Sequence, residues 1–164
     1  MVSNDPIQEM TEAWRQELPD LDVTPMATLA QVNRLALLVN RRVEEALSEV
    51  GRTLADFDVL SALRRQGSPY RLKPSELSRQ VMLSASGMTH RVDLLEAAGL
   101  VERQLDPDNR RITPVALTDE GVEAAEALVR LVVAVEADVL NCLSSKQQSS
   151  LDRLTSRVIA HLTS

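Results

Sequence analysis

The sequence is poor in aromatic residues, cysteine and histidine, and these shortages exclude several classes of protein. Its 164 residues include three aromatic side chains, so the core must consist mainly of Leu, Val and Ala, which favours packed helices over a β-sandwich. The one cysteine cannot form an internal disulfide and fits a reducing cytoplasm. No apolar run exceeds five residues, far below the roughly 20 that a membrane helix needs, and the first ten residues do not resemble a secretory signal. We therefore expect one soluble, mainly helical cytoplasmic domain without a membrane partner.

Catalytic and metal-binding motifs are also missing from the sequence. It contains two histidines, no Gly-rich phosphate loop, no Ser, His and Asp set and no spacing typical of metal ligands. We therefore expect neither an enzyme nor a protein with a metal or other cofactor. Cys142 is expected to be a small buried hydrophobe, and His161 to lie on the surface or at a dimer interface.

The charges are distributed unevenly along the chain, whose net charge is −6. Residues 1–51 carry a net charge of −5 and residues 112–164 a net charge of −3, whereas residues 52–111 carry +2. A mildly positive middle between acidic ends is expected of a DNA-binding module on an acidic scaffold. Of the 18 basic residues 16 are Arg, which suits bidentate recognition, although high-GC codon usage explains the same bias.

Apolar spacing, helix caps and helix breakers predict seven helices and three extended segments. We expect helices over residues 5–17, 26–50, 55–66, 74–81, 84–98, 118–143 and 146–162, and extended segments over residues 70–73, 100–105 and 112–117. The predicted N-caps are Asn4 or Asp5, Ser84 and Thr118. Gly51 is the predicted C-terminal stop of the second helix. Pro114 predicts that the last extended segment is an edge strand.

The middle of the chain has the pattern of a winged helix-turn-helix. Two short helices flank the turn Met82–Ser84, and a strand, a turn with arginines and a second strand follow. The helix over 84–98 starts with small and hydroxyl side chains that allow close approach to DNA, and its opposite face is apolar. The candidate DNA-binding residues are Ser84, Ser86, Gly87, Thr89, His90, Arg91, Arg110 and Arg111. Alternatively, His90 faces solvent and the two wing arginines lie in a solvated turn.

Three stretches resemble the MarR family of bacterial transcriptional regulators: EAAGLVER at 96–103, DPDNRR at 106–111 and VALTDEG at 115–121. The resemblance covers residues 27–164. It implies that the helix over 84–98 enters the major groove, that Arg111 reaches the minor groove, and that the terminal helices form an obligate dimer. The family usually has Asp where this chain has Asn109, so the orienting residue of Arg111 lacks a charge here.

Four further stretches resemble the urate-responsive subgroup of that family, which includes PecS, TamR and HucR. They are WRQELPDLD at 14–22, FDVLSALRR at 57–65, YRLKP at 70–74 and MTHR at 88–91. The resemblance implies that a small anionic effector, with urate as the first candidate, binds Trp14, Asp58, Arg91 and Arg103. Alternatively, Trp14 only staples the first helix to the body, Asp58 and Arg103 form an interhelical ion pair, and Arg91 contacts only phosphate.

Together these observations predict a homodimeric, sequence-specific DNA-binding regulator, which we expect to be a repressor. We expect it to bind a pseudo-palindromic operator and to be released from this DNA by a small anionic or aromatic effector. We expect a mainly α fold with a small β-wing, in a single MarR-type domain over 1–164. Residues 1–50 serve dimerisation and cover the ligand, residues 51–117 form the DNA-binding lobe, and residues 118–164 serve dimerisation. The dimer is predicted because the apolar helical stripes exceed what one small lobe covers. The alternatives are a winged helix that contacts only protein, or a small enzyme.

Overall fold

The computed structural model describes residues 5–81, 85–104 and 113–164. Ser84, Arg110, Arg111 and the proposed cap Asn4 lie outside the described residues, as does Asn109. The chain forms two compact units, Met1–Arg42 and Val43–Ser164, and the boundary falls within one long helix. Among the described residues, none of the helices is both long and apolar enough to cross a bilayer.

The first unit contains α1 (Pro6–Glu17) and the larger part of α2 (Thr24–Glu49). Asp5 caps α1, as predicted, because its carboxylate accepts a hydrogen bond from the Ile7 amide at 3.1 Å. The same carboxylate accepts hydrogen bonds from Gln31 at 3.1 Å and from Arg34 at 2.5 Å, both on α2. The N-cap of α1 therefore also fastens α1 to α2. The helix α2 starts two residues before the predicted position.

The second unit contains the end of α2 and all remaining elements. These are α3 (Leu54–Arg64), β1 (Arg71–Leu72), α4 (Pro74–Val81), α5 (Ala85–Ala97), β2 (Val101–Arg103), β3 (Val115–Leu117), α6 (Asp119–Leu140) and α7 (Ser145–Thr163). Thr118 caps α6 as predicted, accepting a hydrogen bond from the Gly121 amide at 2.9 Å. Gly51 follows α2 with a φ of +69°, in the left-handed conformation expected of a helix stop.

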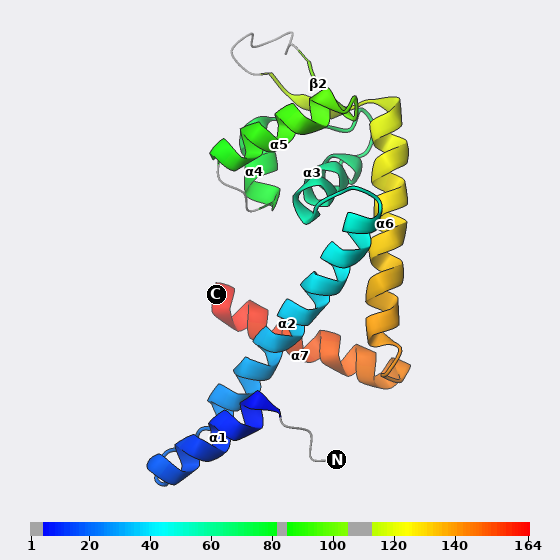
Figure 1. Ribbon diagram of the computed structural model, residues 1–164. Helices are drawn as coiled ribbons and strands as arrows, with labels where there is room; N and C mark the ends of the chain where they lie inside the picture. Colours follow the sequence, from blue (N-terminus) through cyan, green and yellow to red (C-terminus); the bar gives the residue numbers. More distant parts are fainter. Residues whose placement is uncertain (1–4, 82–84, 105–112) are drawn as a thin grey trace. The chain divides into compact units, whose positions relative to one another are not determined.

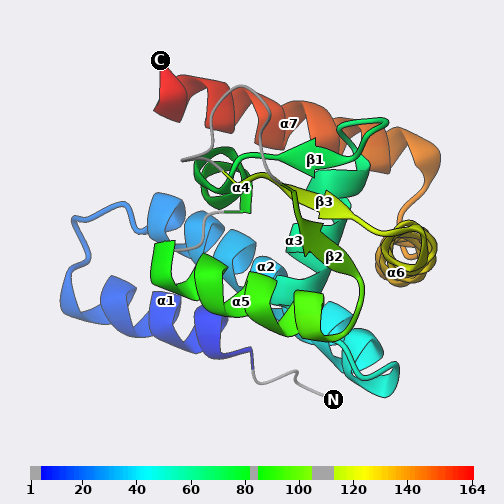
Figure 2. The same cartoon turned by 90° about the horizontal axis from the view of Figure 1, so that it is seen from above.

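The three strands form an antiparallel sheet in the order β1-β3-β2, shown in Figure 2. Val101 lies opposite Leu117, and Arg71 lies opposite Ala116. Because β3 is central, the prediction of an edge strand from Pro114 is wrong. Pro114 lies one residue before β3, where its missing N–H interrupts no ladder bond, and its carbonyl accepts a hydrogen bond from the Gln104 amide at 2.9 Å.

The core of the second unit is aliphatic, as the shortage of aromatic residues predicted. Its largest fully buried side chains come from α2, α3, α4, α5 and the sheet, and they are Leu47, Leu60, Leu63, Leu77, Leu95, Val59, Val101 and Val115. The helix α6 packs along α3, which Figure 1 shows beside it, and buries Ala125, Leu128 and Val132. The helix α3 in turn contacts α4, α5 and β3, and α6 contacts β3.

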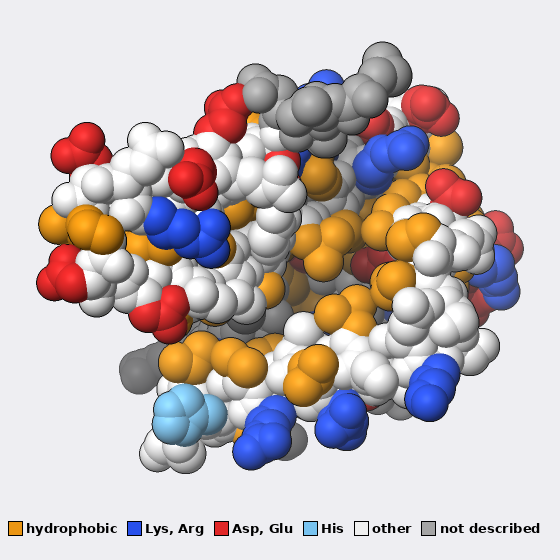
Figure 3. Space-filling model, turned by 90° about the horizontal axis from the view of Figure 1, so that it is seen from below, with side chains coloured by type: hydrophobic (Ala, Val, Ile, Leu, Met, Phe, Trp, Pro, Cys, Tyr) orange, Lys and Arg blue, Asp and Glu red, His pale blue; other side chains and the backbone are white. Residues whose placement is uncertain are grey.

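Several helices also carry exposed apolar side chains, and the view from below shows such side chains, in orange, gathered in patches (Figure 3). None of the residues of α7 is buried. Cys142 is exposed, so its prediction as a buried hydrophobe is wrong. The reason is that α6 ends at Leu140 instead of continuing to residue 143, which leaves Cys142 in the turn before α7. His161 is exposed, which fits the surface alternative.

Candidate nucleic-acid interface

The helix α5 has two chemically different faces. Met88, Val92 and Leu95 recur at spacings of four and three residues and are at most 3% exposed. All three belong to the core cluster. The helix α5 itself packs against α3, α4 and β2 (Figure 1). Four of the predicted DNA-binding residues of this helix are exposed, namely Ser86, Gly87, Thr89 and His90, whereas Arg91 is half-buried. The helix is therefore fixed by its apolar side, and its small polar side chains are accessible to a large partner.

Arg91 lies on α5 but pairs with α3. Its Nη1 donates a hydrogen bond to Oδ1 of Asp56 at 2.9 Å. Asp56 is only 6% exposed, and its Oδ2 accepts hydrogen bonds from the backbone N–H of Thr53 at 2.9 Å and from the Thr53 hydroxyl at 2.8 Å. Burial alone would raise the pKa of the Asp56 carboxyl, but the hydrogen bonds from Thr53 and Arg91 together hold that pKa below its usual value.

Arg103, on β2, fastens the wing strand to the other end of α5. Its Nη2 donates to Asp93 at 2.5 Å, its Nη1 contacts Glu96, and its backbone N–H donates to Glu96 at 3.1 Å. Burial opposes the charged form of Arg103, but the two carboxylates raise its pKa further above the ordinary value. The predicted alternative of an ion pair between Asp58 and Arg103 is therefore wrong, because Asp93 and Glu96 occupy this guanidinium.

Asp58 lies on α3 in a different environment from Asp56. Burial raises the pKa of the half-buried Asp58 carboxyl, and Arg65 partly opposes this shift. Asp58 lines a hollow of about 540 Å³ together with Glu44, Ser48, Arg52, Thr53, Leu54 and Ala55. Neither Arg91 nor Arg103 lines this hollow. Among the described residues, no hydrogen bond or ion pair joins any two members of the predicted effector set, and Trp14 belongs to the other compact unit.

Sequence analysis missed Asp56, although a local signal was present. Thr53 and Asp56 are three residues apart just before an apolar helix, which is the spacing of a capping box. The structure shows both bonds of that motif, since the Asp56 amide also donates to the Thr53 hydroxyl at 3.2 Å. The pattern predicts the cap of α3, but the contact with Arg91, 35 residues away, is visible only in the fold.

A second charged cluster fastens α3 to α6. Arg64 donates to Glu126 at 2.7 Å, and Arg130 donates to the second carboxylate oxygen of Glu126 at 3.1 Å. The Arg64 guanidinium also lies 4.8 Å from the centre of the Tyr70 ring, just before β1. The hydrogen bond from Arg64 is the main cause that lowers the pKa of Glu126. This cluster therefore joins α3 both to α6 and to the residue just before β1.

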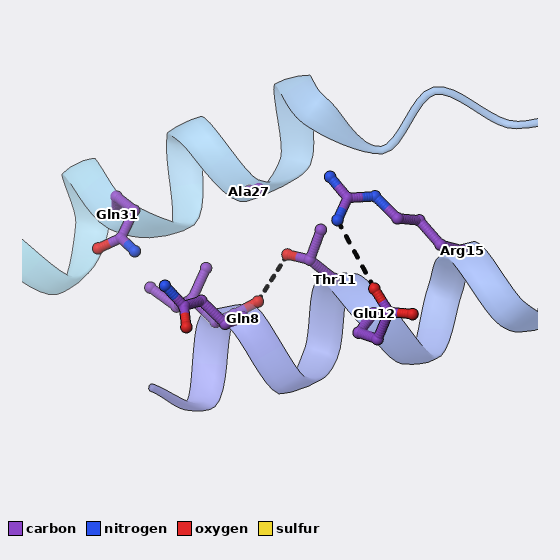
Figure 4. Close-up of a pocket in the computed structure, with 7 residues that line it drawn as sticks. Gln8, Thr11, Glu12, Arg15, Ala27 and Gln31 are labelled. Atoms are coloured by element: carbon purple, nitrogen blue, oxygen red, sulfur yellow. Dashed lines mark hydrogen bonds and ion pairs between the residues drawn. The ribbon is translucent and has the colours of Figure 1, made fainter. Parts of the chain in front are cut away.

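The first compact unit has its own hollow, of about 460 Å³, between α1 and the start of α2. Figure 4 shows Gln8, Thr11, Glu12 and Arg15 of α1 facing Ala27 and Gln31 of α2. Arg15 pairs with Glu12 at 3.7 Å, and the Thr11 hydroxyl donates to a backbone carbonyl of its own helix at 2.6 Å. These groups are therefore already partnered within α1. In the part of the chain that the structure describes, no group of His, Cys, Asp and Glu is arranged to hold a metal ion.

Comparison with known proteins identifies the family. The MarR family model matches residues 50–112. The HTH-type transcriptional regulator PecS of Dickeya dadantii is 35% identical over 156 residues, which cover 95% of this chain and 94% of PecS. This chain belongs to the MarR family of transcriptional regulators. The match with PecS also supports the predicted subgroup.

Two solved structures relate the fold of this MarR-family chain to proteins with bound partners. Rv2887 of Mycobacterium tuberculosis, in complex with p-aminosalicylic acid, is 28% identical with a TM-score of 0.64, covering 79% of this chain and 95% of Rv2887. A variant of MarR from Escherichia coli, complexed with operator DNA, is 23% identical with a TM-score of 0.68, covering 88% of this chain and 96% of that one. The predicted winged-helix fold class is confirmed, with α4 and α5 as the two helices of the DNA-binding motif and β2 and β3 as the strands beside them.

Proposed function

We propose that this MarR-family regulator binds operator DNA as a homodimer, acts as a repressor, and is released by a small anionic effector. The observation that carries the proposal is the two-faced α5, which is held by Met88, Val92 and Leu95 while its small polar side chains are exposed. A helix held in this way can enter a major groove as one body. The MarR variant solved with operator DNA has the same fold.

The proposed DNA-facing residues of α5 are Ser86, Gly87, Thr89 and His90, preceded by Ser84. The wing residues Arg110 and Arg111 are proposed to contact the minor groove. Ser84 and the two wing arginines lie outside the described residues, so their assignment rests on the sequence. The proposed division of the chain is 1–50 and 118–164 for dimerisation and 51–117 for DNA binding.

Binding to the intergenic DNA beside the protein's own gene, measured against a scrambled duplex, tests the DNA assignment. We expect affinity to fall steeply with salt, because phosphate contacts release counterions. Arg111→Ala should weaken binding by about 1–3 kcal/mol. Lys146→Ala removes the same charge from an exposed position on α7 and should leave binding unchanged. Equal affinities for Arg111→Ala and the parent would refute the wing assignment, and no specific binding by the parent would favour a protein-contact module.

The dimer proposal is supported by the exposed apolar face of α7. Its side chains Leu154, Val158, Ile159 and Leu162 are between 51% and 77% exposed. A helix of 19 residues with no buried side chain gains little stability from packing within its own chain, so a second copy is the proposed cover. Exposed apolar side chains also occur along α2 and are proposed to join the same interface.

Sedimentation at micromolar concentration tests the dimer. We expect the parent to be dimeric and Val158→Glu to shift the distribution toward monomer. Ser156→Glu adds the same charge at a polar, exposed position of α7 and serves as the matched control. In the dimer, the two α5 helices should lie about one DNA turn, roughly 34 Å, apart. A parent protein that sediments as a monomer would refute the proposal.

The effector proposal rests on the arginines that hold α5. Arg91 and Arg103 pair with Asp56 and with Asp93 and Glu96, so an anion that binds either guanidinium competes with those carboxylates. Rv2887 was solved with a small aromatic carboxylate, which is one candidate class, and urate is another. Asp58 is proposed to orient an arginine or to accept a proton from the ligand. Ligand and DNA would then compete, with a coupling of about 1–3 kcal/mol.

Fluorescence of Trp14, the sole tryptophan, tests this effector set. Urate and p-aminosalicylate should each be titrated into the free protein and into the DNA complex. We expect at least one of them to quench Trp14 and to release DNA, and Arg103→Ala to abolish that release. If neither ligand changes the fluorescence or the DNA affinity, the effector set is wrong, while the DNA-binding assignment remains.

A further inference from the structure

We infer that Asp56 is a positioning residue for α5 and that Arg91 acts on DNA binding through Asp56 instead of contacting DNA itself. This inference rests on the proposed function, in which α5 is the helix that enters the major groove. It differs from the sequence prediction, which placed Arg91 among the DNA-contacting residues and did not single out Asp56.

The first argument is that the two oxygens of Asp56 have separate tasks. Oδ2 accepts hydrogen bonds from the backbone N–H and the hydroxyl of Thr53, and thereby closes the cap of α3. Oδ1 accepts the hydrogen bond from Nη1 of Arg91. Each oxygen of the carboxylate therefore has its own partner, and a shift of α5 away from α3 would lengthen the bond from Arg91 while the cap stays closed.

The second argument is that α3, which supports α5, is deeply buried in the core. Four residues of α3 within a span of five are completely buried, namely Val59, Leu60, Ala62 and Leu63. The helix also packs against α4, α5 and α6. A hydrogen bond from α5 to the cap of this helix fixes the position of α5 relative to the core. Apolar contacts alone permit sliding, whereas a charge-assisted hydrogen bond in a buried site is sensitive to distance and direction.

The third argument concerns the direction of Arg91. Its side chain is 22% exposed, and its guanidinium contacts a carboxylate that is itself buried. If the guanidinium turned out of this site to bind a DNA phosphate, Asp56 would lose its charged partner, which is unfavourable for a buried carboxylate. The residues before Arg91, from Ser86 to His90, include exposed side chains that can contact DNA while the ion pair stays closed.

The test uses the full-length protein and its operator, with affinity measured over a range of salt concentrations. Asp56→Asn keeps an oxygen that can accept from the Thr53 amide but removes the charge that holds Arg91. Arg91→Gln removes the other half of the pair and leaves the cap of α3 in place. We expect each variant to weaken DNA binding about tenfold, and the double variant to lose no more than either single variant. The slope of affinity against salt should stay unchanged, because no phosphate contact is lost.

Thr53→Val is the matched control. It removes the hydroxyl from the cap of α3 but leaves the Thr53 amide and the pair of Asp56 with Arg91. It should lower thermal stability and change DNA affinity by less than about twofold. Thermal melts of all variants verify folding, and if Asp56→Asn does not fold, Arg91→Gln and Thr53→Val still decide the question.

Three results would overturn the inference. Arg91→Gln could lower the salt slope by about one, which indicates a direct phosphate contact. Folded Asp56→Asn could bind DNA as the parent does. Thr53→Val could lose as much affinity as Arg91→Gln, which would assign the effect to the cap. A parent that binds no DNA overturns the proposed function and this inference together, whereas these three results overturn the inference alone.

Discussion

Gly121, in the first turn of α6, is a position where an added methyl group would collide with backbone. A Cβ at this position would lie 1.8 Å from the carbonyl oxygen of Leu100 and 2.9 Å from its carbonyl carbon. Both atoms are backbone, so the clash can be relieved only if α6 moves away from the end of α5. That movement would stretch the bond from the Thr118 amide to Leu100, at 3.2 Å, and the bond from the Thr118 hydroxyl to Gly99, at 2.7 Å.

The expected loss in the free energy of unfolding for Gly121→Ala follows from these contacts. Overpacking of a close backbone approach costs about 1–3 kcal/mol, and weakening of the Thr118 cap and its neighbouring hydrogen bonds costs about 1–2 kcal/mol. The higher helix propensity of Ala returns about 1 kcal/mol. We therefore expect a net loss of about 1–4 kcal/mol.

Urea denaturation followed by circular dichroism measures this loss, and Gly51→Ala is the control. Gly51 has a φ of +69° with nothing within 4 Å of an added Cβ, so its substitution introduces backbone strain without a clash and should cost about 1 kcal/mol. The reasoning is refuted if Gly121→Ala unfolds within about 0.5 kcal/mol of the parent, or if it is less destabilising than Gly51→Ala.

Three further predictions concern the interior and its charges. Leu60→Ala, at a completely buried position, should lower the free energy of unfolding by about 2–5 kcal/mol, measured by urea denaturation. Asp58→Asn should raise the free energy of unfolding at pH 7, because burial raises the pKa of Asp58 and so disfavours its charged form. Since the side chain is partly exposed, we expect a gain of less than about 1 kcal/mol, and this gain should vanish below the ordinary aspartate pKa. Because the pKa of Glu126 is lowered in the folded state, its carboxylate stabilises the fold above the ordinary glutamate pKa, and this stabilisation is lost as pH falls through the folded-state pKa. Glu126→Gln should therefore make the free energy of unfolding fall less steeply in acid. An unchanged pH profile in thermal melts would contradict the last two.

The starts of α1 and α6 could be predicted because the signals are local. Asp5 and Thr118 have the side chains and spacing of N-caps, and both form the expected bonds. The order of the strands could not be predicted in the same way. Pro114 suggested an edge strand, but β3 is paired on both sides, since β1 contributes a third strand of only two residues. Such a short strand has little pattern of its own and is set by its partner.

The apolar face of α5 was predictable from its helical period, whereas the partners of its charged residues were not. Arg91 and Asp56 are 35 residues apart, so their contact depends on how α3 and α5 pack. The family resemblance placed Asp58 in the effector site together with Arg91. Residues two positions apart on a helix point in different directions, however, and it is Asp56 that faces Arg91. The end of α6 was also misplaced, and this moved Cys142 from the expected interior to the surface.

The charges around α5 suggest how the proposed effector anion would act on DNA binding. Arg91 and Arg103 face three carboxylates, Asp56, Asp93 and Glu96, so this set of five side chains is net negative. The proposed anion would therefore compete with these carboxylates for the two guanidinium groups. The competition lowers the affinity of the anion for the resting protein, and it also loosens a contact that holds α5. Weak intrinsic affinity and strong coupling to DNA binding then have the same cause, because a ligand shifts an equilibrium only by the difference in its affinity for the two states.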